Sequence, residues 1–549
     1  MKRKNGNEKI VGFTIILTLC CFLSSCGYIY LLNSDELSKA IFSGNLEAVK
    51  EAVDNGADVN KSSFFYALHE VPLLYSMRDK SYIISEYLLS NGADPNYIDK
   101  SNGISLLMYA VGARPESGVH YAGLEHSGFY KTLLSDERTD VNLTGKLDYT
   151  ALDYACRDNG CWEIVNDLIN HSARITATTM KCAFEGYEAG NCEESVIKRI
   201  YDGIIEQNIP SGLDPEIEAA IQGDSSKLIS LASSGKIKQE NKQIVMLLTC
   251  AFGNAEALKA LADEDNDYDT RFSGESYWGK TYLGVSSSYG NLEIIEYLLG
   301  ENADIEILSR EFFTNQEKSP LTYALQNNHL DIADYLFLRG AKLQIAASGT
   351  SGGRPDVLEI VCKNGDIEAV KWVVEHGYPL DEERLQKAMS EAARNDHIDV
   401  LKHFLFDLKA DINSEYYFSI VLGCAGIASF ETVKFLIDNG ANINGGKEHI
   451  WTPLDRAVSS NRADMVLYLI EQGADVNLVG THDGYTPSHP LTVAIQNGYY
   501  EIVKILVEHG ADLDYKEGWA DGKDTPLEIA EGGSSKRIAD YIKNALNDK

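Results

Sequence analysis

One six-residue phrase returns along the chain and limits its possible folds more than any other feature. The phrase is Asn-Gly-Ala-Asp-x-Asn at residues 55–60 and 91–96, with close copies at 439–444, 472–477 and 510–514. Weaker copies occupy residues 302–306, 340–343 and 410–413. Gly440 and Gly473 are 33 residues apart, and Gly473 and Gly510 are 37 apart. A period of this size is typical of an array in which each unit packs only on its neighbours.

Two further phrases precede each copy and predict a pair of helices. Thr-Pro-Leu or Ser-Pro-Leu, followed by Ala, occurs at residues 452–457, 319–324 and 525–530, with a variant at 150–155. Thr or Ser caps a helix, and Pro at the first helical position loses no hydrogen bond. Gly-Asn-Leu at residues 44–46 and 290–292 predicts a tight turn into a second helix. The glycine of Gly-Ala-Asp then supplies the left-handed residue that ends that helix.

These phrases, in this order, resemble the ankyrin repeat, most closely in the C-terminal third. The resemblance implies an all-α solenoid of stacked helix-turn-helix units, of which we expect about fourteen from Asp35 onward. We expect ankyrin repeats at residues 35–175, degenerate helical repeats at 176–280 and ankyrin repeats again at 281–549. The histidine that the family usually carries after Thr-Pro-Leu is replaced here by Asp153, Thr322, Asp455 and Glu528. We therefore expect a weaker polar network between repeats, with the least stable part at 176–280.

The N-terminal residues predict export. Lys2, Arg3, Lys4 and Lys9 precede an apolar run over residues 10–23, which is the pattern of a signal peptide. Residues 23–26, Leu-Ser-Ser-Cys, resemble the bacterial lipobox, in which the cysteine is lipidated and becomes the new N-terminus. We therefore expect a signal peptide at residues 1–25 and a lipidated Cys26 with a short tether at 26–34. The body would then be held at a bacterial cell envelope, at the outer membrane, in the periplasm or on the cell surface.

A second interpretation of the same segment stays open. No charged residue occurs from residue 10 to residue 34. Roughly 20 apolar residues suffice to span a bilayer, so this segment also fits an uncleaved membrane anchor. Both interpretations place the body outside the cytoplasm, because positive charges at the N-terminus stay inside.

The charge balance excludes some classes of partner. The chain carries 49 Lys+Arg against 82 Asp+Glu, a formal net charge of −33. Nucleic acid needs a basic footprint, so we expect no nucleic-acid partner, whereas a basic protein is favoured. We find no nucleotide loop and no metal-ligand spacing of histidines, and we therefore expect no enzyme, no catalytic residues, no metal, no cofactor and no small-molecule substrate. The acidic run at residues 263–269 lacks the glycine and terminal glutamate of an EF-hand, which favours a solvated loop over a calcium site.

Four cysteines, Cys156, Cys161, Cys182 and Cys192, lie within two adjacent expected units. In an exported protein they can form disulfides, whose pairing the sequence does not define. The alternative is that they are small buried apolar side chains, as free cysteines commonly are.

The candidate binding residues come mainly from the resemblance, which implies that the turn tips after each Gly-Ala-Asp phrase line a concave, protein-binding face. Aromatic and cationic side chains are the usual anchors of interfaces. Those at the tips are Tyr97, Lys100, Lys447, His449, Trp451, His482, Tyr485 and Trp519, and a long insertion adds Tyr277 and Trp278. For Trp451 and Tyr485 the alternative is that they only cover the following loop.

The function we expect is protein–protein interaction by an exported, membrane-anchored scaffold. Two alternatives remain at this stage. One is a structural lipoprotein that spaces the envelope without a stoichiometric partner. The other is a neutraliser of a secreted toxin or a modulator of an envelope enzyme.

Overall fold

The computed structural model describes twenty segments that cover most of the chain. These are residues 35–42, 46–65, 68–78, 82–100, 103–113, 129–145, 147–159, 161–188, 192–207, 209–262, 267–269, 279–310, 316–344, 356–413, 424–426, 428–445, 452–481, 487–516, 524–532 and 536–547. The expected signal peptide, Cys26 and the tether lie outside these segments. Within them, no helix is both long enough and apolar enough to cross a bilayer.

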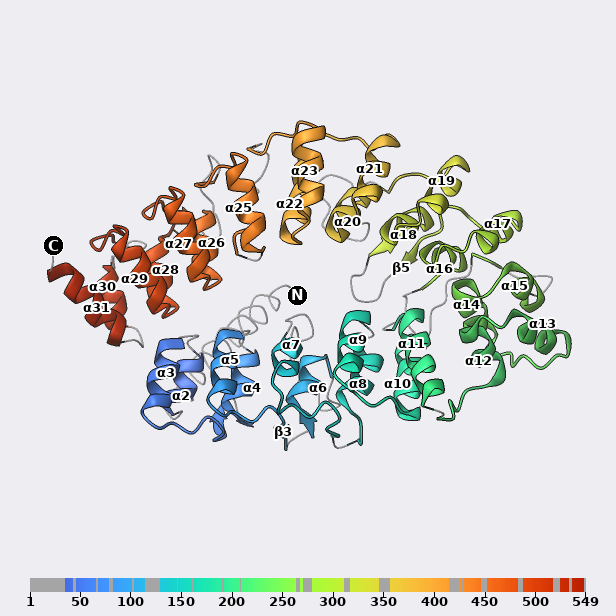
Figure 1. The fold of residues 1–549 in the computed structure, drawn as a ribbon, viewed down its shortest axis with the longest axis horizontal. Coiled ribbons are helices and arrows are strands. Elements are labelled where there is room, and N and C mark those ends of the chain that lie inside the picture. The colour runs from blue at the N-terminus through green and yellow to red at the C-terminus, as the bar shows by residue number, and fades with distance from the viewer. Residues whose placement is uncertain are drawn as a thin grey trace, which may run out of the picture. The chain divides into compact units, whose positions relative to one another are not determined.

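The expected fold class is confirmed: short antiparallel helices follow one another in pairs, and the few strands form small hairpins (Figure 1). The chain divides into two compact units. The first comprises Met1–Ala110, Arg114–Lys146 and Leu491–Lys549, and the second comprises Val111–Ala113 and Leu147–Pro490. The domain boundaries expected near residues 175 and 280 both lie within the second unit and stay predictions.

In the first unit the helices come in pairs of a short first helix and a longer second one. They are α2 (Glu36–Phe42), α3 (Leu46–Asp54), α4 (Pro72–Arg78), α5 (Tyr82–Ser90), α6 (Leu106–Ala110), α7 (Phe129–Leu134), α29 (Tyr500–Glu508), α30 (Pro526–Gly532) and α31 (Lys536–Asn547). The helix α28 (Pro490–Gln496) begins at the last residue of the second unit. The hairpins β1–β2 (Ser63–Phe65 and Leu68–Glu70) and β3–β4 (Ile98–Asp99 and Ile104–Ser105) belong to this unit.

The second unit repeats the same pairing over a longer stretch. Its helices are α8 (Ala151–Tyr154) continued by the π-turn η1 (Ala155–Asn159), α9 (Trp162–Asn170), α10 (Ala177–Glu188), α11 (Glu194–Glu206), α12 (Pro215–Gln222), α13 (Ser225–Ser233), α14 (Lys242–Phe252), α15 (Ala255–Leu261), α16 (Tyr282–Ser288), α17 (Leu292–Gly300), α18 (Pro320–Gln326), α19 (Leu330–Leu338), α20 (Val357–Asn364), α21 (Ile367–Glu375), α22 (Glu382–Arg394), α23 (Ile398–Lys402) continued by the π-turn η2 (His403–Asp407), α25 (Phe430–Asp438), α26 (Pro453–Ser459) and α27 (Ala463–Glu471). Its hairpins are β5–β6 (Ser309–Arg310 and Glu317–Lys318) and β7–β8 (Gly480–Thr481 and Pro487–Ser488).

The predicted start and stop signals act as expected. The Thr452 hydroxyl accepts a hydrogen bond from the Asp455 N–H, with Pro at the first position of α26. Ser319 caps α18 in the same way through the Thr322 N–H. At the far end of the second helices, Gly92 and Gly440 both have φ of 89°. The left-handed conformation at these glycines ends each helix and turns the chain toward the next pair.

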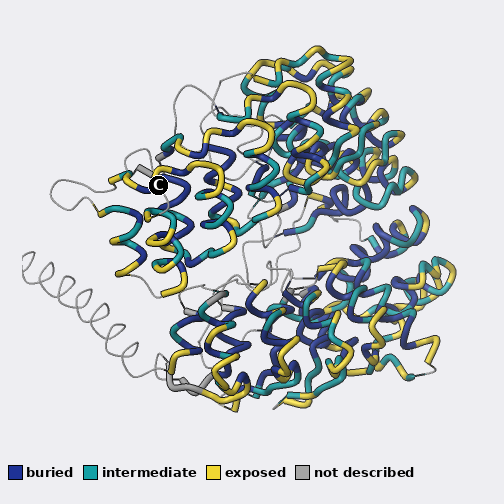
Figure 2. Tube along the Cα trace, turned by 60° about the vertical axis from the view of Figure 1, so that its left-hand side comes forward, coloured by how far each residue is buried: buried dark blue, intermediate teal, exposed yellow. Residues whose placement is uncertain are grey.

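The core runs between the helices of each pair and between neighbouring pairs. In the second unit the first helices α12, α14, α16 and α18 pack on one another in series, and the second helices α13, α15 and α17 do the same. In α17 the side chains of Ile294, Ile295 and Leu298 are fully buried, which is one face of a helix. Figure 2 shows buried residues along the helices and exposed residues in the turns between them. Each pair thus buries its apolar face only against its neighbours, as a stacked repeat requires.

We expected a weaker polar network between repeats where the family's histidine is missing. At Asp153 and Asp455, however, the described side chains make well-defined polar contacts. Each forms a reciprocal capping box with the threonine three residues before it. The buried Asp153 carboxylate also accepts a hydrogen bond from Thr179 Oγ1 of the next pair, at 2.7 Å. An acid at the family's histidine position therefore caps its own helix and, at Asp153, also bonds to the neighbouring repeat.

Candidate protein-binding surface

Each copy of the Gly-Ala-Asp phrase folds into a tight turn that we call a finger, the segment between a second helix and the next first helix. The aspartate side chain accepts a hydrogen bond from the backbone N–H two residues later, at 2.9 Å for Asp58 to Asn60 and for Asp94 to Asn96. The same bond forms from Asp304 to Glu306 and from Asp475 to Asn477. This Asx turn explains why the phrase has Asp or Asn at its fourth position in every copy except the weak one at 340–343, which has Lys342.

The last residue of the phrase joins each finger to the next. The Asn60 side chain donates to the Gly92 carbonyl at 2.9 Å and accepts from the Asp94 N–H at 2.8 Å. Asn413 makes the same two bonds, to the Gly440 carbonyl and from the Asn442 N–H. Because an amide both donates and accepts, one Asn side chain fixes the register between two fingers.

Two of the fingers that carry an acid at this position keep half of the bridge. The Asp304 N–H donates to Asp269 at 2.8 Å, and the Lys342 N–H donates to Glu306 at 2.7 Å. A carboxylate accepts only, so it has no proton for the neighbouring carbonyl. Each of these two fingers is therefore joined to the next by one hydrogen bond instead of two.

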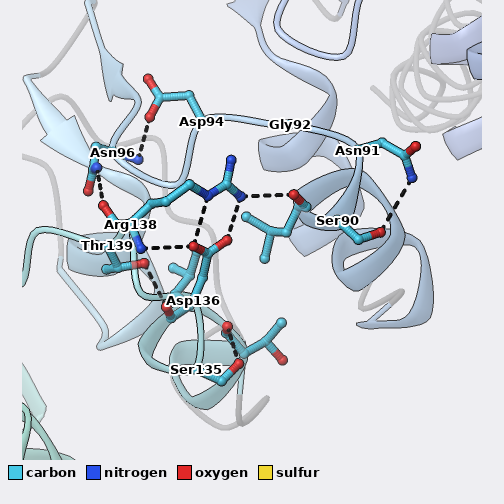
Figure 3. Close-up of polar contacts among 12 residues, drawn as sticks. Ser90, Asn91, Gly92, Asp94, Asn96, Ser135, Asp136, Arg138 and Thr139 are labelled. Carbon is cyan, nitrogen blue, oxygen red and sulfur yellow. Dashed lines mark hydrogen bonds and ion pairs between the residues drawn. The ribbon is translucent and has the colours of Figure 1, made fainter.

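Figure 3 shows the bridge where Arg138 stands in place of the usual glycine. The Asn96 side chain donates to the Arg138 carbonyl at 2.7 Å and accepts from the Asp140 N–H at 2.7 Å. The Arg138 guanidinium bonds to the Asp136 carboxylate and donates to the Leu89 carbonyl at 2.8 Å. The hydrogen bond from Arg138 lowers the pKa of Asp136 below its ordinary value, which keeps the carboxylate ionised.

The hairpin β3–β4 is the finger that carries two of the predicted binding residues. Ile98 pairs with Ser105 and Asp99 with Ile104, and the buried Tyr109 hydroxyl donates to Asp99 at 2.9 Å. Tyr97 lies half-buried at the base of the hairpin, where its carbonyl accepts from the Leu106 N–H. Lys100 follows β3 and is exposed. Lys100 is therefore exposed on the hairpin, whereas Tyr97 is half-buried and its backbone helps to hold the hairpin to the start of α6.

The other predicted binding residues lie outside the described part of the chain. They are Tyr277, Trp278, Lys447, His449, Trp451, His482, Tyr485 and Trp519. They remain predictions, as does the interpretation of Trp451 and Tyr485 as loop cover.

The four clustered cysteines are free thiols in the structure. Cys156, Cys182 and Cys192 are buried, whereas Cys161 is exposed. Burial raises the pKa of Cys182 to about 12, so its thiol stays protonated at neutral pH. This is the state of a small apolar core residue rather than of a nucleophile. Among the described residues, no group of three His, Cys, Asp or Glu side chains is arranged to hold a metal ion.

Several exposed apolar side chains on the second helices were not among the predicted binding residues. Leu338 ends α19 and is 86% exposed, and Phe406 in η2 is 48% exposed. Leu338 carried a usable signal, because the last residue of the other nine-residue second helices is small or polar. Phe406 carried the same signal, because it lies eight residues after Ile398, at the position that Leu338 occupies in α19.

Comparison with known proteins identifies the repeats directly. Models described as ankyrin repeats match residues 217–309, 246–347 and 420–480 in one case and 454–507 in another. The match from residue 217 includes part of the stretch that we expected to be degenerate.

Several curated proteins are similar over part of the chain. Ankyrin repeat and KH domain-containing protein mask-1 of Caenorhabditis elegans is 29% identical over 255 residues, which is 46% of this chain and 9% of that protein. Alpha-latrocrustotoxin-Lt1a of Latrodectus tredecimguttatus is 26% identical over 48% of this chain and 19% of the toxin. Potassium channel AKT2/3 of Arabidopsis thaliana is 25% identical over 32% of this chain and 22% of the channel.

The aligned part spans less than a quarter of each of these relatives. Their names describe unlike proteins, so what they share with this chain is the repeat. Together, the matches and the helix pairs show that the chain contains ankyrin repeats, at residues 217–347 and 420–507.

Proposed function

We propose that this protein is a non-enzymatic scaffold that binds another protein through its fingers and the adjacent first helices, the concave face that the resemblance implies. Ankyrin repeat proteins mediate protein–protein interaction. The observation that carries the proposal is the bridge made by Asn60, Asn96 and Asn413, which fixes successive fingers in one register. A row of turn tips held in this way loses little conformational entropy when it binds, which favours affinity.

The charge of the chain supports a basic partner. The formal net charge of −33 creates a field that attracts positively charged proteins and speeds their association. Lys100 at its tip would then contact an acidic or aromatic group at the rim of a mostly basic surface.

We further propose that the protein is exported in a bacterial cell and held in the envelope by lipid on Cys26. The basic start, the apolar run and the Leu-Ser-Ser-Cys sequence at residues 23–26 support this. Metabolic labelling with a radioactive fatty acid tests it, because the wild-type chain should be labelled and Cys26→Ala should not. An unlabelled wild-type chain that stays with the membrane would instead support the uncleaved anchor.

In-cell crosslinking of the full-length chain, followed by affinity purification, tests the binding function. We expect one protein in near-equal amount, and we expect it to be reduced several-fold in Lys100→Glu and in Trp451→Ala with Tyr485→Ala. Lys504→Glu is the matched control, because Lys504 is 44% exposed on the second helix α29, outside the fingers and the first helices.

A partner that is unaffected by the finger variants would contradict binding by the fingers. A high-copy protein with no stoichiometric partner would favour the structural spacer.

A further inference from the structure

A solvent-facing leucine breaks the pattern of the second helices. Leu338 is the last residue of α19 and is 86% exposed. Nine-residue second helices elsewhere end in small or polar residues, namely Asp54, Ser90, Asn170, Ser233, Gly300, Glu375, Asp438, Glu471 and Glu508. The repeat therefore does not need an apolar side chain at this position, and exposing a leucine to water brings no gain in folding.

Phe406 is exposed at the same helix position two pairs further along the chain, eight residues after Ile398, as Leu338 is eight residues after Leu330. In η2 the Leu408 N–H donates to the His403 carbonyl five residues back, so this turn contains one residue more than an α-helical turn. Phe404 occupies the buried position, and Phe406 is left 48% exposed with its ring edge-to-face on Phe435 at 6.4 Å. Turns of this kind inside helices are frequent at functional sites.

Phe337, next to Leu338, packs with two aromatic rings that lie between these two positions in the sequence. The Trp372 indole N–H donates to Asp334 at 2.7 Å, and the His376 ring stacks on Trp372 with ring centroids 3.8 Å apart. Phe337 meets both rings edge-on, at 5.5 and 5.1 Å. We call Phe337, Leu338, His376, Phe406 and Phe435 the second-helix patch, because they lie on, or directly after, the second helices α19, α21, α23 with its continuation η2, and α25 (Figure 1).

The charges on the same helices indicate what this patch would accept. Each lysine there is paired with an acid of its own helix: Lys371 with Glu368, Lys402 with Asp399, and Lys434 with Asp438. Five further acids, namely Asp331, Asp334, Glu375, Asp407 and Glu431, outnumber the one arginine, Arg339, which follows Leu338 and stacks on the Tyr335 ring. The patch is therefore apolar with an acidic surround.

This charge disfavours two of the three obvious occupants. A second copy of the chain would bring its own net charge of −33 against the same acids. An anionic lipid surface would be repelled in the same way. A basic segment with apolar side chains would instead gain from both the apolar contact and the charge.

We propose that the second-helix patch is a separate docking surface for a protein segment that carries leucine or aromatic anchors flanked by Lys or Arg. Leu338 and Phe406 are the anchor contacts, and the acids set the preference for a basic sequence. The surface does not use the fingers, so this proposal stands or falls independently of the function proposed above.

A displayed library of random peptides, selected on the full-length chain, tests the chemistry. The same library is depleted first on Leu338→Ser with Phe406→Ser, so that only peptides that need the patch are kept. We expect the retained peptides to be enriched in Lys or Arg together with Leu, Phe or Trp. Retained peptides that are acidic or uncharged, or no peptide that needs the patch, would overturn the proposal.

The affinity of the best retained peptide then provides the quantitative test. We expect at least about a tenfold loss for the double variant and weaker binding as salt rises. Ile205→Ser is the matched control, because Ile205 is 51% exposed on α11 and lies outside the patch, and it should leave affinity unchanged. An equal loss in Ile205→Ser, binding of phosphatidylcholine vesicles that Leu338→Ser abolishes, or self-association that Leu338→Ser abolishes would each contradict the proposal.

Discussion

Two parts of the second unit join their neighbouring helix pairs in different ways. In the pairs α16–α17, α18–α19 and α26–α27 the two helices have 7 and 9 residues, and a side chain of one finger bonds to the backbone of the next, as Glu306 does to the Lys342 N–H. In the middle of this unit, from α10 to α15, the helices α10 and α11 are longer, with 12 and 13 residues. Neighbouring pairs there are joined by hydrogen bonds between two side chains. Lys238 bonds to Asp214 at 2.7 Å, and Gln222 bonds to Tyr201 at 2.8 Å.

The strongest of these middle contacts joins residues that are far apart in the sequence. The Lys280 ammonium donates to the Glu194 carboxylate at 2.8 Å, across 86 residues, and Glu194 is 4% exposed. The Tyr187 hydroxyl donates to the same carboxylate at 2.8 Å, and burial raises the pKa of that tyrosine. The comparison teaches that the phrase encodes a bond to any neighbour's backbone, whereas the middle depends on individual side-chain partners.

Breaking the Glu194–Lys280 pair should have the largest effect. Lys280→Met leaves a buried carboxylate without its cation, at a cost of about 3 kcal/mol, because removal of one partner exposes the desolvation penalty of the other. Hydrogen exchange at α11 and α16 should speed up accordingly. The control Lys371→Met removes an exposed pair with Glu368 and should change exchange little.

The second variant of the pair separates charge from packing. Glu194→Gln combined with Lys280→Met removes both charges and should restore much of the protection. Equal exchange in Lys280→Met and Lys371→Met would show that the buried pair does not hold the middle together.

Glycines in the two kinds of turn should differ in their tolerance of a methyl group. Gly290 and Gly440 both have positive φ, so an alanine costs about 1 kcal/mol at either position. At Gly440 nothing lies within 4 Å of an added Cβ, whereas at Gly290 it would lie 2.7 Å from His329 Nδ1. Because of this contact with His329, we expect Gly290→Ala to lower the free energy of unfolding by about 1 kcal/mol more than Gly440→Ala does.

The His329 ring cannot easily move away, because its Nε2 lies 3.0 Å from the Ser288 carbonyl. His329→Ser in the Gly290→Ala background should therefore recover part of the loss in a urea titration. Equal free energies of unfolding for Gly290→Ala and Gly440→Ala would show that the contact with His329 costs no stability.

A single amide in a finger should have a smaller effect. Asn96→Asp keeps the acceptor for the Asp140 N–H but loses the donor to the Arg138 carbonyl, at a cost of about 1 kcal/mol. The reverse change, Asp269→Asn, supplies a donor where the bridge now has one bond and should stabilise by less than about 1 kcal/mol. Changes of the same sign in the two variants, measured by urea unfolding, would contradict the role of the bridge.

Thiol labelling should show the smallest effect, since it leaves the fold intact. In native protein at pH 8, maleimide should modify the exposed Cys161 and spare Cys182 and Cys250, which are buried. Burial raises the pKa of Cys250 to about 12, so raising the pH from 7 to 9 should not make it reactive. Peptide mass spectrometry checks this, and a Cys161 that labels only after reduction would support a disulfide instead.

Much of the fold could be predicted because its signals are local. The caps at Thr452 and Ser319 and the left-handed glycines at 92 and 440 are each determined by a few adjacent residues. The Glu194–Lys280 pair could not be predicted, because nothing near either residue specifies a partner 86 positions away. The extra residue of η2 was equally hidden, since a single insertion is not visible in a repeat with variable spacing.

The candidate site was predicted less completely than the fold. Resemblance placed Tyr97 and Lys100 at a finger, and the structure shows that hairpin with Lys100 exposed. It gave no reason to examine the second helices, although a comparison of their last residues would have singled out Leu338. Which tips bind a partner depends on the partner's surface, and the sequence of one chain does not contain that surface.

Site-specific photo-crosslinking tests the central claim, binding by the fingers, most directly. A photoreactive amino acid replaces Lys100 in one variant and Lys504 of the second helix α29 in another, in otherwise full-length chains. We predict that one discrete protein is captured from position 100 and that position 504 captures little of it. Capture of that protein only from position 504, or no discrete adduct from position 100, would contradict the claim.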